Sequence, residues 1–474
     1  MRVAVFAAEA VPYSKTGGLG DVAGALPKAL RQVGVDSVLV TPLYKQTKEN
    51  LLDHLAIDDF RVEWGGREVR AQIYYSERNG SPTFLIHQPE MFFRDSIYGY
   101  REDYERFAFF NHAAVQLLRR LDKPVDIIHL NDWHCGFAAV EIAKLRRWDS
   151  FWRNTRTVFS IHNLAYQGAF GMEELRKLGF GDDFSHNAFS FQGAASAMKA
   201  GLADSDMLST VSKRYGYEIQ QAENGYGLDW LLRQRSDRLF GIVNGVDYDV
   251  WNPATDKDLA AHFNREDLSG KRECKRVLLQ KFLLPENLDR PIFASVTRLT
   301  AQKGFELIQQ IIGEILATGA YFIALGSGES ASEDFLQRLK NHAPNQVGVF
   351  KGYNEPLAHQ IEAGADMFLM PSKFEPCGLN QMYSLRYGTV PIVRAVGGLD
   401  DTVENFDKVS GTGNGFKFNE FRADKLLEKI YEALFTYYDA EAWRKLQWNG
   451  MTVDNSWENA ARKYVELYQM TLHN

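Results

Sequence analysis

The chain has 474 residues, which is long for one hydrophobic core and favours two or three domains. Its 54 Lys and Arg residues and 61 Asp and Glu residues give a formal net charge of −7, and both signs are scattered along the sequence. We therefore expect no polybasic surface for nucleic acid or anionic lipid. No apolar run approaches the roughly 18 residues of a membrane span, so no membrane partner is expected either.

The start of the chain and its cysteines indicate a compartment. An apolar strand begins at Arg2, and the charged, apolar and small-residue regions of a leader peptide do not precede it. We therefore expect no signal or transit peptide and a cytoplasmic location. Cys135, Cys274 and Cys377 are isolated and form no C-x-x-C pair. This spacing fits neither a disulfide framework nor a structural zinc site and favours a reducing compartment.

Short β-branched runs alternate with helical patterns along the whole chain. In the first half, strands are predicted at 3–7, 38–41, 127–130, 158–161, 208–211 and 242–243. In the second half, strands are predicted at 292–296, 322–325, 347–350, 368–370 and 390–393. Such alternation is typical of a parallel sheet with helices on both faces. The sequence therefore predicts two doubly wound α/β domains.

The polar stretch 252–271 begins with an Asn-Pro turn signal and is the expected crossing between the domains. We expect a first domain at 1–250 and a second at 251–455. After a capping-box pattern at Asn455 and Glu458, apolar residues recur at helical spacing. This pattern predicts a terminal helix over 456–474.

Unusual residue clusters follow several predicted strands. Residues 15–21 (KTGGLGD) lie between the first strand and a helical pattern, where glycines let backbone amides approach an anion at the helix start. The lysine precedes the glycines, so the cluster is not a Walker loop. A tight connection without a ligand is the alternative.

Two further clusters lie in the second half. In residues 297–304 (TRLTAQKG), Arg298 and Lys303 could converge on one diphosphate, although solvated surface charge is the alternative for either cation. In residues 371–379 (PSKFEPCGL), Glu375 brings a carboxylate to the edge of a buried strand. The alternative for this acid is a place in the first turn of a helix.

Six ordered motifs resemble those of the bacterial glycogen synthases and plant starch synthases. They are KTGGL at 15–19, DWH at 132–134, HNLAYQG at 162–168, NGVD at 244–247, RLT with QKG at 298–304, and EPCGL at 375–379. The resemblance extends from about residue 3 to the terminal helix. It implies a GT-B fold, with two Rossmann-like doubly wound parallel-sheet domains, a cleft between them and a last helix that crosses back to the first domain.

The same resemblance implies an activity. The protein would transfer glucose from ADP-glucose to the non-reducing end of an α-1,4-glucan, with retention of the α configuration. The N-terminal domain would lie on the acceptor side and the C-terminal domain would bind the donor. No metal or other cofactor is implied, and ADP-glucose and the glucan are the expected partners.

Roles for single residues also follow from the resemblance. Catalytic residues would be Glu375 on the transferred glucose, Arg298 and Lys303 on the diphosphate, and His162 and Asp132 along the sugar site. Donor-binding residues would be Lys15, Gly18, Asn244, Tyr353, Cys377, Gly378 and Leu379, with Tyr353 stacked on adenine. Acceptor-binding residues would be Tyr98, Trp133 and Tyr166. The sequence departs from the family pattern at Lys213, ahead of Arg106, and at Asn380.

Retention by double displacement would need a nucleophilic carboxylate beneath the sugar, and the sequence identifies none. Front-face attack by the acceptor hydroxyl, with the leaving phosphate as proton acceptor, is therefore favoured. Cys377 near a helix start is a further candidate nucleophile, but the resemblance gives it a packing role.

Metal sites were weighed on two patterns. D-x-D triplets occur at 204–206, 247–249 and 256–258, and His129, Asp132 and His134 have ligand-like spacing. Such triplets arise easily by chance, and successive strand-end side chains point in different directions. A metal site is therefore not expected.

Other functions remain as alternatives. A non-catalytic glucan-binding or priming protein could have the same fold, but it would not need the cations Arg298 and Lys303. A UDP-glucose-preferring glucosyltransferase is a second alternative. A dehydrogenase is disfavoured because no G-x-G-x-x-G follows the first strand.

Overall fold

The computed structural model describes residues 1–121 and 124–473. The chain divides into two compact units, residues 1–245 together with 457–474, and residues 246–456. The first unit is thus assembled from two segments far apart in the sequence. The division falls between Gly245 and Val246, whereas the boundary expected from the sequence followed residue 250.

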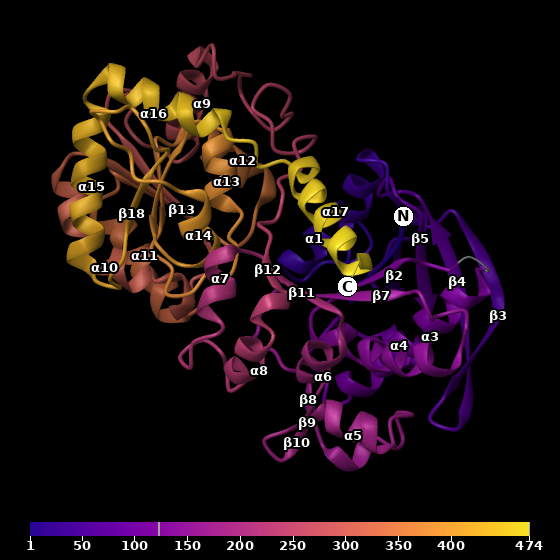
Figure 1. Cartoon of the computed structure of the whole chain (residues 1–474). Coiled ribbons are helices and arrows are strands. Elements are labelled where there is room, and N and C mark those ends of the chain that lie inside the picture. The colour runs from indigo at the N-terminus through magenta and orange to yellow at the C-terminus, as the bar shows by residue number, and fades with distance from the viewer. Residues whose placement is uncertain (122–123, 474) are drawn as a thin grey trace. The chain divides into compact units, whose positions relative to one another are not determined.

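The first unit is built on a nine-stranded sheet in the order β12-β11-β7-β6-β1-β2-β5-β4-β3 (Figure 1). Its strands are β1 (Arg2–Phe6), β2 (Asp36–Pro42), β3 (His54–Trp64), β4 (Arg67–Ser76), β5 (Thr83–His87), β6 (Ile127–Asn131), β7 (Arg156–Ile161), β11 (Met207–Thr210) and β12 (Leu239–Gly241). The strands from β12 to β5 run parallel, and β4 and β3 add an antiparallel edge. A small antiparallel sheet contains β8 (Ala169–Phe170), β9 (Ser190–Phe191) and β10 (Ala194–Ser196).

The expected strands of this unit overlap the observed ones, except at 242–243. There the strand lies earlier, at β12, and ends at Gly241. A Cβ on Gly241 would lie 2.3 Å from Cα of Lys213, so the strand passes close to the start of α7 (Lys213–Glu218) at this point. The hairpin β3-β4 and the strand β5 were not predicted, because the edge hairpin carries many exposed charged residues.

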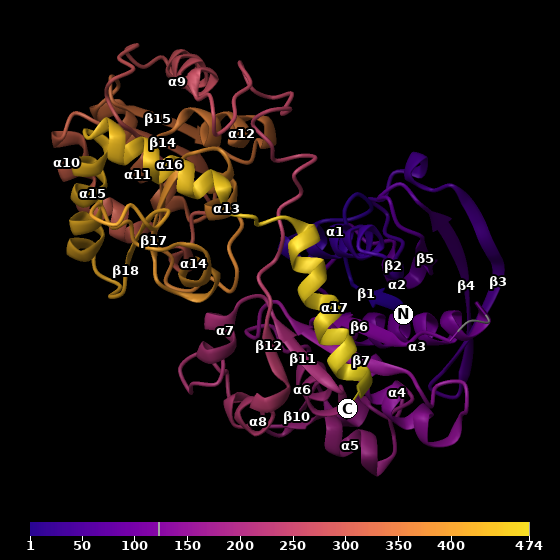
Figure 2. The ribbon, with the colours of Figure 1, turned by 45° about the horizontal axis from the view of Figure 1, so that its top comes forward.

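Helices cover both faces of this sheet. On one face, α1 (Gly18–Gln32) and α17 (Trp457–His473) lie side by side, as Figures 1 and 2 both show. The other face packs against α3 (Asp103–Arg120), α4 (Gly136–Trp148) and α6 (Ala197–Asp204). The terminal helix is thus present over 457–473; Asn474 lies outside the described residues. Shorter helices are η1 (Glu49–Leu51), α2 (Pro89–Phe92), η2 (Trp133–Cys135), η3 (Met172–Glu174), α5 (Asp183–Phe189), α7 (Lys213–Glu218), α8 (Asp229–Gln234) and η4 (Ser236–Arg238).

The second unit contains a six-stranded, fully parallel sheet in the order β15-β14-β13-β16-β17-β18. Its strands are β13 (Ile292–Val296), β14 (Tyr321–Gly326), β15 (Val347–Lys351), β16 (Met367–Met370), β17 (Val390–Arg394) and β18 (Phe416–Phe418). The helices are α9 (Ser269–Lys281), η5 (Ala301–Lys303), α10 (Phe305–Ala317), α11 (Ser330–His342), α12 (Glu355–Gly364), α13 (Asn380–Arg386), α14 (Gly397–Thr402), α15 (Ala423–Tyr437) and α16 (Ala440–Thr452).

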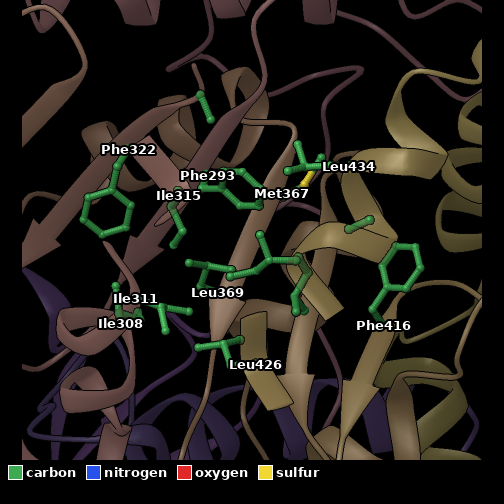
Figure 3. Close-up of a cluster of buried hydrophobic side chains, with 14 of the residues drawn as sticks. Phe293, Ile308, Ile311, Ile315, Phe322, Met367, Leu369, Phe416, Leu426 and Leu434 are labelled. Carbon is green, nitrogen blue, oxygen red and sulfur yellow. The ribbon is translucent and has the colours of Figure 1, made fainter. Parts of the chain in front are cut away.

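Alternating side chains of this sheet fill two separate cores. Phe293, Phe322, Met367 and Leu369 pack with α10 and α15 on one face, as Figure 3 shows for the labelled residues. The residues between them, such as Ile292, Ile323 and Phe368, pack on the other face with α9 and α12. This period of two explains why the strands are apolar throughout: both faces are buried.

Both sheets have a point at which the strand order reverses. In the first unit β1 lies between β2 and β6, and in the second unit β13 lies between β14 and β16. Loops that leave neighbouring strands in opposite directions create a crevice at the carboxyl ends, where open α/β sheets bind ligands. The residue clusters found in the sequence follow β1, β6, β13 and β16.

Candidate active site

Lys303 and Glu375 form an ion pair at the carboxyl ends of β13 and β16. Ser372 Oγ donates a hydrogen bond of 3.2 Å to the same carboxylate oxygen of Glu375. Only 18% of the Lys303 side chain and 9% of the Glu375 side chain are exposed. The ammonium is therefore held at the edge of the sheet with little solvent to screen its charge.

Backbone contacts lock the two loops that carry this pair. Gly304 has φ +65°, and a Cβ there would lie 2.0 Å from the carbonyl oxygen of Pro371. The amide of Lys373 donates to the carbonyl of Gln302 at 2.8 Å, and Gln302 Nε2 donates to the carbonyl of Phe374 at 3.1 Å. The loops after β13 and β16 are thus joined on both sides of Lys303, which fixes its distance from Glu375.

The segment from Glu375 to Leu379 packs closely against the helices α13 and α14. Gly397 begins α14, and a Cβ there would lie 1.9 Å from the carbonyl oxygen of Glu375. Gln381 Nε2 donates to the carbonyls of Cys377 at 3.1 Å and Gly378 at 3.0 Å. Cys377 is buried, with 7% of its surface exposed, and Leu379 immediately precedes α13. This segment is therefore a rigid turn at the start of a helix.

Arg298 and Tyr353 extend from the same edge of the sheet. Arg298 follows β13, is exposed, and makes no side-chain ion pair within residues 1–121 and 124–473. Tyr353 follows β15 beyond Gly352, which has φ +117°, and 72% of the tyrosine is exposed. The second unit therefore presents a cation and an aromatic ring to solvent at the same edge of the sheet as the Lys303–Glu375 pair.

In the first unit the glycine-rich loop follows β1. Lys15 Nζ contacts Asp21 Oδ1 at 2.8 Å, and both side chains are partly exposed. Gly18 is the first residue of α1, and no atom lies within 4 Å of the position that its Cβ would take. The loop thus leaves open space at a helix start, where the dipole favours an anion.

Glu9 was not identified from the sequence, and the structure places it beneath this loop. Its carboxylate accepts hydrogen bonds from the backbone amides of Thr16 and Gly17, and only 2% of the residue is exposed. Burial raises the pKa of Glu9 to about 7 against the opposing effect of these amides. The sequence signal available for Glu9 was the position of an acidic residue shortly after a buried strand.

Asp132 and His162 lie together after β6 and β7. Asp132 Oδ1 accepts the backbone amide of His162 at 3.2 Å, and Asp132 has φ +60°, a strained value for a residue with a side chain. Burial raises the pKa of Asp132 to about 7. Asp132 and His162, both predicted from the sequence as site residues, therefore lie together, and the Asp132 carboxylate stabilises the turn at His162.

The protonation of His162 is set by Asn131. Asn131 Nδ2 donates to the carbonyl of Phe6 at 2.9 Å, so its Oδ1 faces His162 Nε2 at 2.9 Å and accepts from it. Burial lowers the pKa of His162 to about 4, so the ring is neutral at pH 7. With the proton on Nε2, Nδ1 is left as an acceptor for a hydroxyl group.

Tyr98 is held in place by a buried arginine. Arg106 donates to the carbonyl of Ile97 at 3.0 Å and pairs with Asp103, whose carboxylate accepts the Gly99 amide at 2.8 Å. The Tyr98 ring stacks on His134 at 4.8 Å between centroids. Its hydroxyl is buried without a hydrogen-bond partner in the described part of the chain. An unpaired buried hydroxyl is costly unless a ligand satisfies it.

The other predicted sugar-site residues differ in exposure. Trp133 is 9% exposed, and Gly168 lies so close that its Cβ would be 2.1 Å from the indole. Trp133 therefore packs in the interior, and its ring presents no open face. Tyr166 is 63% exposed. Asn244 is 7% exposed, and its Oδ1 has no partner among the residues the structure describes.

Two residues from the metal-like sequence patterns are hydrogen-bonded to other side chains of the protein. His129 bonds to Tyr468 and Ser160, at 2.7 and 2.6 Å, and so points away from Asp132. Both oxygens of Asp206 accept from Arg146, at 2.9 and 2.8 Å.

Within residues 1–121 and 124–473, one group has metal-ligand geometry, Asp256, Asp258 and His359. There His359 Nδ1 lies 2.6 Å from Asp256 Oδ2, and Tyr387 donates to the same oxygen at 2.5 Å. The shared oxygen of this group is thus already hydrogen-bonded twice within the protein.

Comparisons with known proteins agree over the full length. Residues 2–234 match the family described as starch synthase catalytic domain, and residues 279–445 match glycosyl transferases group 1. The glycogen synthase of Koribacter versatilis (strain Ellin345) is 44% identical over 477 residues, which cover 99% of this chain and 98% of that protein. The chain belongs to the glycogen and starch synthase family. The glycogen synthase of Anaeromyxobacter dehalogenans (strain 2CP-C) is also 44% identical, over 99% of each chain.

Solved structures were compared with this chain as well. The catalytic domain of starch synthase IV from Arabidopsis thaliana, bound to ADP and acarbose, has a TM-score of 0.90 and 34% identity, over 100% of this chain and 99% of that chain. Sucrose-phosphate synthase from Thermosynechococcus elongatus, with a TM-score of 0.61 and 17% identity, shares the fold. The predicted GT-B fold class is confirmed, and the protein is a glycosyltransferase with glycogen or starch synthase activity. Among the described residues, none of the helices could span a membrane.

Proposed function

We propose that this glycosyltransferase uses ADP-glucose as its donor and extends the non-reducing end of an α-1,4-glucan with retention of the α configuration. The observation that carries the proposal is the Lys303–Glu375 pair beside exposed Arg298, at the reversal point of a parallel sheet. Support for the nucleotide comes from the related starch synthase IV structure, which holds ADP and acarbose.

The second unit is proposed to bind the donor. Arg298 and Lys303 bind the diphosphate, Glu375 binds the transferred glucose, and Tyr353 stacks on the adenine. The rigid turn formed by Cys377, Gly378 and Leu379 offers backbone amides to the sugar and the phosphate. Lys15 and Gly18 contribute a cation and a helix start to the same ligand, and Asn244 an amide.

Cleavage of the sugar–phosphate bond separates charge: the diphosphate gains negative charge while positive charge grows on the glucose ring. A cation aimed at the departing oxygens stabilises that state, and one such group contributes roughly 3 to 4 kcal/mol in a site that excludes water. Lys303 suits this task because its partner loops fix it and little of it is exposed. The acceptor hydroxyl then attacks from the same face, and the leaving phosphate takes its proton.

The first unit is proposed to bind the glucose ring and the acceptor. His162 Nδ1 accepts a hydrogen bond from a sugar hydroxyl, and the unpaired hydroxyl of Tyr98 binds the incoming glucan. Asp132 shapes the turn that presents His162. Tyr166, which is exposed, and Trp133, which is largely buried, are proposed to line the acceptor site.

No metal is proposed for the reaction, because two side-chain cations and helix-start amides can stabilise the leaving group. A cytoplasmic location is proposed as well. Its support is that Cys135, Cys274 and Cys377 are buried and are not joined in disulfides.

The decisive experiment measures initial rates with ADP-glucose and UDP-glucose on one glycogen primer. We expect faster incorporation from ADP-glucose, and release of the new label by an exo-enzyme specific for terminal α-1,4 bonds. Faster transfer from UDP-glucose would overturn the donor assignment. Binding of glycogen without incorporation from either donor would mean a glucan-binding protein.

A further inference from the structure

An open cavity of about 500 Å³ lies in the first unit, and none of its lining residues belongs to the candidate active site. Four arginines line it: Arg146 and Arg147 in the last turn of α4, and Arg235 and Arg238 around η4. The whole chain carries a formal net charge of −7, so four guanidinium groups on one hollow are a local excess of positive charge. A concave site with one sign of charge attracts ions of the opposite sign.

The cavity lies at the amino ends of two strands of the large sheet. Residues 204–206 of its lining immediately precede β11, and Arg238 immediately precedes β12. Asp132 and His162 instead follow the carboxyl ends of β6 and β7, which run parallel to β11. The cavity and these two residues therefore lie at opposite edges of one sheet. The helices α4, α6 and α8 near the cavity are labelled in Figure 1.

Two of the four arginines are engaged within the protein. Both oxygens of Asp206 accept from Arg146, at 2.9 and 2.8 Å. Arg235 donates to backbone carbonyls at the end of α6, including those of Ala203 at 3.1 Å and Ser205 at 2.6 Å. Cations at helix C-termini also balance the helix dipole, so these two arginines have a structural role. Their contacts fix the wall of the cavity before a ligand binds.

The other two guanidinium groups are available to a ligand. Arg147 is exposed, lies over the ring of Phe184 at 4.3 Å, and has no ion pair or hydrogen bond within residues 1–121 and 124–473. Arg238 Nη1 donates to the carbonyl of Asp206 at 3.4 Å, and its Nε lies 3.9 Å from the exposed carboxylate of Asp237. An exposed pair at that distance contributes little. A stacked guanidinium keeps its planar fork free for two oxygens of a phosphate group.

Two further groups of the lining have no partner in the described part of the chain. They are the Ser205 hydroxyl, in a residue that is 2% exposed, and the buried Oδ2 atom of Asp204. Burial raises the pKa of Asp204 to about 6, so its carboxyl group is ionised at pH 7 and accepts hydrogen bonds. Buried polar groups without partners are costly unless a ligand satisfies them. An inorganic anion would leave Asp204 unpaired, whereas a ligand that also has hydroxyl groups would donate to it.

We propose that this cavity binds a small phosphate ester of a sugar or another polyol, with its phosphate on Arg147 and Arg238 and its hydroxyl groups on Asp204 and Ser205. A phosphate monoester carries a charge of about −1.5 to −2 at pH 7 and has three acceptor oxygens, which two guanidinium groups can match. The volume of the cavity lies within the roughly 300 to 1,000 Å³ of small-molecule sites.

The test measures binding to the full-length protein by isothermal titration calorimetry, with ribose 5-phosphate and inorganic phosphate as probes. We expect the wild type to bind ribose 5-phosphate, and Arg147→Ala/Arg238→Ala to raise its Kd at least about tenfold. Asp204→Ala should raise the Kd for ribose 5-phosphate about fivefold without weakening inorganic phosphate, because only the ester donates to the carboxylate. Circular dichroism checks the fold of each variant.

Two controls separate this cavity from other sources of binding. Arg70→Ala removes one positive charge from the edge strand β4 of the same unit, where 73% of the side chain is exposed, and should leave the Kd unchanged. Lys303→Ala removes a cation of the candidate active site and should also bind ribose 5-phosphate as the wild type does.

Absence of binding to the wild type would overturn the inference. Binding that is lost in Lys303→Ala and kept in Arg147→Ala/Arg238→Ala would overturn it too, because the phosphate would then lie in the active site. An equal loss in Arg70→Ala would mean a general effect of charge. Equal affinities for both probes, unchanged by Asp204→Ala, would overturn the assignment to a polyol ester. The measurement needs no turnover, so its result does not depend on the donor and acceptor proposed above.

Discussion

The ammonium of Lys303 is paired with the carboxylate of Glu375, across two loops that leave neighbouring parallel strands. An ion pair with a structural role alone would contribute to stability and little to activity. A cation that pairs with a carboxylate only until a diphosphate binds would contribute strongly to catalysis. The two interpretations differ in what removal of the lysine does.

Lys303→Ala should lower kcat about 100-fold, because the developing charge on the diphosphate loses its closest cation. Initial rates with ADP-glucose and glycogen measure the effect, and circular dichroism checks the fold. Lys373→Ala is the control, as an exposed lysine in the adjoining loop whose loss should change kcat little. Near-normal turnover of Lys303→Ala would remove it from the proposed role.

Glu9→Gln should raise the KM for ADP-glucose about fivefold to tenfold. The carboxylate accepts the amides of Thr16 and Gly17 with two oxygens available, whereas a carboxamide offers these amides one acceptor oxygen. The glycine-rich loop should then hold Lys15 and Gly18 less firmly. An unchanged KM would mean that the loop keeps its shape without this acceptor.

Glu9→Gln should also change the pH dependence of the Tm. The pKa of Glu9 is raised by burial from its ordinary 4.5 to about 7, so the folded state holds its proton more tightly than the unfolded chain does. The resulting stabilisation is complete below about pH 4.5 and is lost as the pH rises to about 7. Relative to the wild type, the Tm of Glu9→Gln should therefore rise between pH 5 and pH 8. A constant Tm difference would contradict the raised pKa.

Tyr98→Phe should separate binding from folding. The hydroxyl is buried without a partner in the described chain, so its removal should not lower the Tm. If it binds the acceptor, the KM for the glucan should rise about fivefold to tenfold while the KM for ADP-glucose is unchanged. An equal change in both constants would indicate a general disturbance of the loop that Arg106 supports.

Treatment with EDTA should leave the initial rate unchanged, because side chains and helix-start amides stabilise the leaving group in the proposed reaction. Assays before and after dialysis against the chelator measure this. The variant Asp258→Asn tests the one described group with metal-ligand geometry and should keep full activity. A loss of activity that manganese restores would contradict the scheme.

The sequence predicted the architecture wherever strands are buried on both faces. Phe293 and Phe368 belong to runs that are apolar throughout, and these runs became central strands. The edge hairpin β3-β4 was missed because one face lies in solvent and charged residues interrupt the pattern. The position of the short strand β12 was predicted a few residues too late, because the close approach of Gly241 to the start of α7 is a tertiary contact that the local sequence does not indicate.

In the candidate site, too, features set by the local sequence were predicted and features set by tertiary contacts were not. Lys303 and Glu375 could be brought together from the rule that ligands bind at the carboxyl ends of parallel strands. The burial of Trp133 could not be predicted, since it depends on Gly168, more than thirty residues later in the chain. Glu9 was missed because its role depends on the path of a loop that folds back over it.

The discontinuous first unit has a consequence for how the protein is made. The hydrogen bonds of its buried histidine, His129, are completed by Tyr468 of α17, and that helix leaves the ribosome after the whole second unit. During synthesis, the sheet face that α17 covers stays exposed until the whole second unit has emerged. A nascent chain that stalls or is cut near residue 456 would therefore expose this face to chaperones and proteases, even though both sheets were complete.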